Sequence, residues 1–215
     1  LLFDLTITYK NQTDEELTIQ YLGIRLFNSI ISSIKLLLAG YYQGSIIFQR
    51  DILEVGFLLD YFLLYPKEVS SWKNSNKQDR FNRYRPSIIR DALDRRDGFL
   101  DKKRSKKYQI MCEYAAHATF PGFKMVSPKK LVKIGPFFDL NYLTFVIQEL
   151  SINVPLFAII YLRQFKSLPS DFVKMQKDYL GEVEKWAHKY LKLDFKKPGF
   201  DIIKDWISTT TKNYL

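Results

Sequence analysis

The sequence predicts an all-α fold, a helical bundle with long, strongly apolar central helices and a polar, basic arm. Apolar residues recur every three or four positions between Leu17 and Leu38, which is the spacing of one helix face. Residues 42–65 are apolar almost all round, as in a helix at the centre of a bundle. Strict alternation of apolar and polar residues, which marks half-buried strands, is nearly absent.

Start and stop signals define the N-terminal elements. Residues 1–9 are expected to be extended. Thr13 or Asp14 can cap the first long helix, and Gly40 can end it, because these residue types satisfy free backbone groups at helix termini. The second long helix ends at Pro66, since proline disrupts a helix interior.

The composition then changes to a polar, basic stretch over residues 67–107, here called the basic arm. A short amphipathic helix begins in it at Pro86 and ends by Gly98. Residues 108–120 are predicted to form a helix that Pro121 closes.

Three further helices are predicted towards the C-terminus. They cover residues 138–165, with a kink at Pro155, then 171–191 and finally 200–210.

The chain has 215 residues, of which 47% are hydrophobic and 26% charged. This balance is that of a globular protein and excludes disordered and low-complexity classes. We expect a single helical domain over residues 1–215. Its bundle core would cover about 14–122, with C-terminal helices at about 138–213 packing on that core.

The charge balance favours anionic partners. There are 33 Lys and Arg against 23 Asp and Glu, a formal net charge of +10, which suits nucleic acid or a membrane surface. Residues 140–162 are long enough to cross a bilayer. Four residues interrupt this stretch: Gln148, Glu149, Asn153 and Pro155. We therefore expect no membrane partner.

The cysteine and histidine content limits which metal sites the chain could form. The single cysteine, Cys112, lies in an apolar stretch, which favours a reducing compartment and a cytoplasmic location. With His117 and His188 it gives too few ligands for a Cys/His zinc site, and we expect no metal. Phosphate-loop, dinucleotide, serine-hydrolase and calcium-loop motifs are absent from the sequence, so no cofactor is expected.

Arg50 and Glu54 are the first candidate site residues. They lie four residues apart, on one face of the apolar 42–65 helix. Because an unpaired charge is costly to bury, we expect both to be substantially buried and to share a polar partner from another helix. The pair could fix helix packing or form the polar floor of a cleft.

His117 is the second candidate. It lies one turn before Pro121, at the end of the predicted 108–120 helix, where the helix dipole stabilises a cation. It could cap that helix with Glu113, or act as a general acid or base, since histidine titrates near neutrality.

The basic arm is the third candidate, because its cations are interleaved with the aromatic residues Phe81 and Tyr84. Phosphates and unstacked bases bind to such surfaces. The predicted nucleic-acid-binding residues are Arg80, Arg83, Arg85, Arg90, Lys102, Lys103 and Arg104. A solvated helix face would have a similar composition, because aspartates neutralise part of the charge.

One succession of residues between about 40 and 122 resembles uncharacterised bacterial helical proteins. These proteins are similar to the HEPN group (higher eukaryotes and prokaryotes nucleotide-binding). The residues that carry the resemblance are Arg50, Glu54, Trp72, Arg90, Asp91, Leu93, Asp94, Tyr108, His117 and Pro121.

The resemblance implies a helical fold and a role in a bacterial defence or toxin-type system. Many members of the HEPN group are metal-independent ribonucleases, in which an arginine precedes a histidine by four to six intervening residues on one helix. Neither His117 nor His188 has an arginine at that spacing. If this chain is a ribonuclease, His117 would be the acid or base, Arg50 would stabilise the pentavalent phosphate and Glu54 would hold Arg50.

Two functions therefore stand as expectations. The first is a HEPN-like protein that binds or cleaves RNA. The alternative is a non-catalytic interaction module that forms a homodimer or docks a cognate protein. An enzyme should gather Arg50, Glu54 and His117 around one cleft open to solvent.

Overall fold

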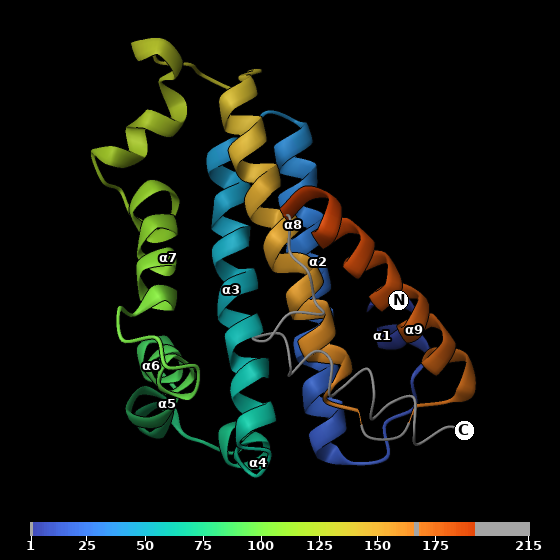
Figure 1. The fold of residues 1–215 in the computed structure, drawn as a ribbon. Coiled ribbons are helices and arrows are strands. Elements are labelled where there is room, and N and C mark those ends of the chain that lie inside the picture. Colours follow the sequence, from blue (N-terminus) through green and yellow to red (C-terminus); the bar gives the residue numbers. More distant parts are fainter. Residues whose placement is uncertain (1, 166–167, 192–215) are drawn as a thin grey trace. The chain divides into compact units, whose positions relative to one another are not determined.

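The computed structural model describes residues 2–165 and 168–191, and every regular element in these ranges is a helix (Figure 1). The predicted all-α class is confirmed for this part of the chain. The helices are α1 (Leu2–Thr8), α2 (Asp14–Leu38), α3 (Tyr42–Leu64), α4 (Glu68–Lys73), α5 (Lys77–Arg83), α6 (Pro86–Arg96), α7 (Lys103–Met111), α8 (Leu140–Leu162) and α9 (Ser170–Trp186). Shorter turns of helix are η1 (Cys112–Ala116), η2 (Pro121–Val126), η3 (Pro128–Lys130) and η4 (Ala187–Leu191).

The chain divides after Phe165 into two compact units, which are described separately. The first contains α1 to α8, and the second contains α9 and η4. The helix predicted at 200–210 lies outside the described residues.

The extended start predicted for residues 1–9 is wrong, because α1 occupies most of it. Leu5 is fully buried and Tyr9 nearly so, and α1 packs on α2. The side-chain amide of Gln20 on α2 donates to the Thr6 carbonyl at 2.8 Å. This short segment is helical because tertiary contacts with α2 stabilise it, and local sequence does not report them.

The boundaries of α2 follow the predicted signals. The Thr13 hydroxyl accepts a hydrogen bond from the Glu16 amide at 3.1 Å, so Thr13 is the N-cap. Gly40 ends the turn after α2 with a φ of +78°, a conformation that glycine adopts without strain.

Helix α3 is the centre of the first unit and contacts α2, α6, α7, α8 and η1. Two glycines allow α8 to approach closely: a Cβ on Gly56 would overlap the Phe157 ring, and one on Gly23 would overlap Tyr161. Phe157 and Tyr161 are almost fully buried. Helix α8 coincides with the apolar 140–162 stretch and continues past Pro155.

The region after α3 is more helical than predicted, since α4 and α5 precede the expected helix at Pro86. Asn76 caps α5 by accepting from the Asp79 amide at 2.9 Å. The predicted 108–120 helix is wrong in its bounds. It begins earlier, at Lys103, widens into the π-helical turn η1 after Met111 and ends where His117 adopts extended backbone angles.

Candidate functional site

Arg50 and Glu54 meet a third side chain, Tyr108 from α7. The Arg50 guanidinium donates to Glu54 Oε1 at 2.8 Å and to the Tyr108 hydroxyl at 2.9 and 2.6 Å. The Tyr108 hydroxyl in turn donates to Glu54. This is the shared polar partner that the sequence predicts, and it links α3 to α7.

Arg50, Glu54 and Tyr108 each hydrogen-bond to the other two. The side chains of Arg50 and Glu54 are 29% and 23% exposed. Burial, with the neighbouring Glu54 carboxylate, raises the pKa of Tyr108, so the phenol stays protonated and can donate. The guanidinium of Arg90 covers the Tyr108 ring, 4.1 Å from its centroid. These contacts join α3, α6 and α7, and they hydrogen-bond Arg50, Glu54 and Tyr108 to one another.

His117 lies apart from this cluster. It follows η1, is exposed, and within the described ranges its side chain forms no hydrogen bond or ion pair. Its backbone amide donates to the Cys112 carbonyl at 2.9 Å. The pairing with Glu113 considered above is not formed in the described residues, because the helix ends before His117, whose backbone is extended.

A cavity of about 170 Å³ opens beside Glu54. Its walls come from α2, α3, α4 and α6, and its residues are Leu22, Arg25, Glu54, Val55, Phe57, Leu58, Trp72, Tyr84, Pro86 and Ile89. Arg50 and His117 are not among them. The cavity therefore unites Glu54 with Arg25 and not with the other two predicted catalytic residues.

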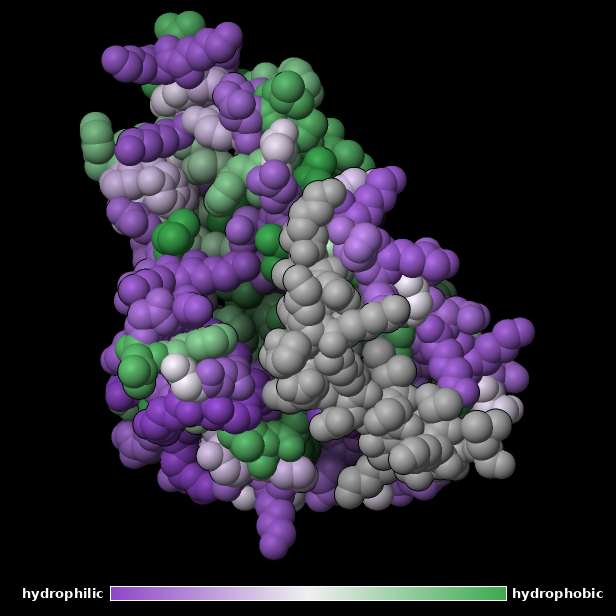
Figure 2. Space-filling view, in the orientation of Figure 1, coloured by the Kyte–Doolittle hydropathy of each residue, from purple (hydrophilic) through white to green (hydrophobic). Residues whose placement is uncertain are grey.

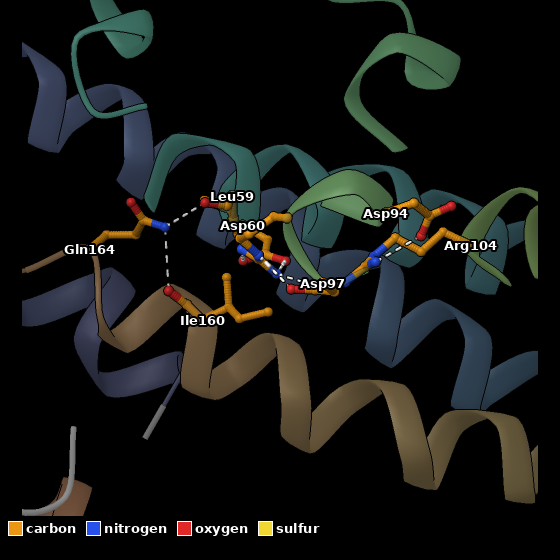
Figure 3. Close-up of polar contacts among 8 residues, drawn as sticks. Leu59, Asp60, Asp94, Asp97, Arg104, Ile160 and Gln164 are labelled. Carbon is orange, nitrogen blue, oxygen red and sulfur yellow. Dashed lines mark hydrogen bonds and ion pairs between the residues drawn. The ribbon is translucent and has the colours of Figure 1, made fainter. Parts of the chain in front are cut away.

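Several cations of the basic arm point into the protein. Arg104 donates to Asp94 at 2.8 Å and also to Asp97. Arg96 donates to both oxygens of Asp60, at 2.7 and 2.9 Å, and to Asp97. Figure 3 shows Asp60, Asp97, Arg104 and Asp94 in a row across α3, α6 and α7.

The residues of this row form a connected set of ion pairs. Burial alone would raise the pKa of Asp97, but hydrogen bonds from Arg96 and Arg104 outweigh it and hold the pKa below its usual value. Of the predicted nucleic-acid-binding residues, Arg90 is 7% exposed and Arg104 is committed to this row. Arg83 pairs with Glu68 at 2.9 Å on the surface. These three are therefore engaged within the protein.

Other cations of the arm face solvent. Six are exposed and form no ion pair in the described part of the chain: Lys77, Arg80, Arg85, Arg95, Lys102 and Lys103. Phe81 in the same arm has 59% of its surface exposed, and the guanidinium of one of the six, Arg85, lies 5.5 Å from its ring centroid. The arrangement offers cations and one aromatic face to a ligand.

Sequence reasoning missed the Asp60–Arg96–Asp97 contacts, and it did not single out Tyr108 as the partner of Arg50. The available signal was the acid content of the arm, where aspartates are interspersed among the arginines. Within the described residues no cluster of three or more His, Cys, Asp or Glu side chains has the geometry of a metal site.

Comparison of the chain with protein-family models, curated proteins and solved structures gave no match. The resemblance to the HEPN group stays a prediction.

Proposed function

We propose that this chain binds RNA through the exposed cations of its basic arm and does not cleave it. The observation that carries the proposal is the set of six exposed cations of the arm that form no ion pair within the described residues, together with exposed Phe81, beside which Arg85 lies. Backbone phosphates would contact the cations, and an unstacked base can lie on the exposed ring. The choice of RNA rests on the resemblance to the HEPN group.

The positions of the predicted catalytic residues support binding over cleavage. Arg50 already donates to Glu54 and Tyr108, so a phosphate would have to displace internal partners to reach it. His117 is exposed on a different element. A proton donor or acceptor must lie within hydrogen-bond reach of the reacting group. The groups at that distance from Arg50 are Glu54 and Tyr108, and both are already hydrogen-bonded to Arg50 and to each other.

Fluorescence anisotropy with a labelled single-stranded RNA, titrated at several salt concentrations, tests the binding. The logarithm of the association constant should fall linearly with the logarithm of salt, by about 0.7 per phosphate contact. A variant with Arg80, Arg85 and Lys103 changed to Gln should lose up to about 2 units of that slope.

The matched control changes Lys124, Lys130 and Lys133 to Gln, which removes the same charge outside the arm. Its slope should equal that of the parent. Equal losses in both variants, or no binding at low salt, would contradict the proposal and leave the interaction module as the better interpretation.

A cleavage assay in EDTA separates binding from catalysis. We expect no cleavage of a broad RNA panel by the parent chain. Cleavage that His117→Ala and Arg50→Ala both abolish would instead establish a metal-independent ribonuclease with the residues named from the resemblance.

A further inference from the structure

The segment between η1 and α8 exposes a group of large apolar side chains. We call residues 120–140 the lysine-rich loop. Six of its apolar residues are strongly exposed: Phe120 (83%), Leu131 (64%), Val132 (75%), Ile134 (99%), Phe138 (78%) and Leu140 (63%). Figure 2 shows apolar and polar atoms intermixed at the end of the first unit where α8 begins. Several large exposed apolar side chains on one short segment point to an interaction site, whereas single exposed residues need no explanation.

The loop is attached to the bundle and so presents these side chains from a defined backbone. The Gln43 side-chain amide on α3 donates to the Gly122 carbonyl at 3.3 Å. The Asp139 amide donates to the Tyr42 hydroxyl at 3.0 Å, and Met125 is buried. Other residues of the same loop therefore pack against the bundle, and the exposed apolar residues are not needed for that packing.

The turn between α2 and α3 extends this apolar end. The Phe137 amide donates to the Gly40 carbonyl at 3.4 Å, which brings Phe138 beside exposed Leu38. A cavity of about 340 Å³ lies here, and its lining includes Leu37, Leu38, Tyr42, Phe137, Phe138 and Leu143. The apolar surface is thus continuous over two separate segments.

Between Phe120 and Phe138 every charged residue of the loop is a lysine, and the one acid of the loop, Asp139, caps α8 with its side chain. Lys124, Lys129, Lys130 and Lys133 lie in it, and no Asp or Glu occurs between Tyr114 and Phe138. In the described residues none of the four lysines forms an ion pair. A ligand that matches the lysine-rich loop must therefore carry negative charge for the lysines and an apolar region for the exposed side chains.

Two alternative occupants meet only one of these needs. A symmetric contact with a second copy would bury the apolar side chains but set the same lysines against each other. RNA would neutralise the lysines but leave Val132 and Ile134 in water. The surface of an anionic bilayer offers phosphates and carboxylates at the headgroups and an apolar boundary just beneath them.

We propose that the lysine-rich loop rests on an anionic lipid surface, with Ile134, Val132 and Phe138 at the boundary between headgroups and acyl chains. The expectation of no membrane partner concerned a spanning helix. By length and composition alone α2 and α8 could span a membrane, but a surface contact requires no span. This contact goes beyond the proposed RNA binding and uses different residues.

Vesicle flotation with the full chain tests the proposal. The chain should float with phosphatidylcholine vesicles that contain about 30% phosphatidylserine, should not float with phosphatidylcholine alone, and should be released by salt. Changing Lys124, Lys130 and Lys133 to Gln should weaken binding about 100-fold, since each lysine near such a surface contributes about five-fold. Ile134→Ser combined with Phe138→Ser should weaken it at least about ten-fold at unchanged charge.

The arm variant with Arg80, Arg85 and Lys103 changed to Gln is the matched control, and its vesicle affinity should fall by no more than about three-fold. Circular dichroism confirms that each variant keeps its helices. Absence of flotation at low salt, or equal losses in the loop and arm variants, would overturn the proposal. The proposal would also be overturned if sedimentation velocity showed a dimer that the Ile134→Ser, Phe138→Ser variant dissociates and the chain did not bind vesicles. Because loop variants should keep RNA affinity, the two proposals can fail separately.

Discussion

The basic arm and the lysine-rich loop are both cationic, but the structure uses their charges differently. In the arm, Asp94 and Asp97 engage Arg104 in the interior, and only part of the positive charge faces solvent. In the loop the one acid, Asp139, caps α8, no acid occurs between Tyr114 and Phe138, and the neighbours of the lysines in the sequence include exposed apolar side chains. Acids within a basic stretch therefore indicate which cations are structural, and the neighbours of the free cations indicate the kind of partner.

The sharpest test of this difference is Asp97→Ala. It removes a carboxylate that pairs with both Arg96 and Arg104, whose side chains are largely buried. Because some solvent reaches the pair, we expect a loss of about 2–3 kcal/mol in the free energy of unfolding, below the range for fully buried pairs. Urea denaturation measures it.

Asp101→Ala is the control in the same arm. Asp101 is exposed and 3.9 Å from Lys106, so its removal should cost less than about 0.5 kcal/mol. Equal losses for the two variants would mean that the inward network contributes no more than a surface pair.

Glu54→Ala tests the cluster of Arg50, Glu54 and Tyr108, which is part of neither of the two proposed binding surfaces. It leaves Arg50 with Tyr108 alone and should cost about 2 kcal/mol, because the guanidinium is partly exposed and can recruit water. Thermal melting measures the loss, and Glu54→Gln should cost less because it keeps an acceptor. RNA and vesicle affinities should not change, since Glu54 lies in neither binding surface. A lost RNA affinity with normal stability would instead place Glu54 in a ligand site.

The long helices were predictable because their signals are local. The spacing of apolar residues in α2 and the Thr13 cap lie within one helix and need no knowledge of neighbours. Helix α1 was not predictable in this way, since its burial depends on a docking surface that α2 supplies. Element boundaries near η1 were missed because the π-helical turn leaves no periodic signal.

The candidate site was predictable only in part. That Arg50 and Glu54 need a polar partner follows from the cost of burying charge. That Tyr108 provides it depends on the register of α7 against α3, across 58 residues of chain, which no spacing within either helix specifies. For the same reason the sequence did not separate Arg104, which points inward, from Lys103, which points outward.

The smallest expected effect concerns pH. Hydrogen bonds from Arg96 and Arg104 hold the pKa of Asp97 below its usual value, against the effect of burial. A carboxylate with a lowered folded-state pKa stabilises the protein above its unfolded pKa of about 4, and the contribution is lost as pH falls through the folded value. The stability of the parent should therefore decline below about pH 4, and Asp97→Asn should decline less steeply over the same interval. The control is the variant with Lys124, Lys130 and Lys133 changed to Gln. Because no acid occurs between Tyr114 and Phe138, its stability should change with pH as that of the parent does.

Urea midpoints measured between about pH 3 and 6 give the dependence of stability on pH for each protein. An unchanged dependence in Asp97→Asn would show that this carboxylate is not the source of the acid sensitivity of the arm.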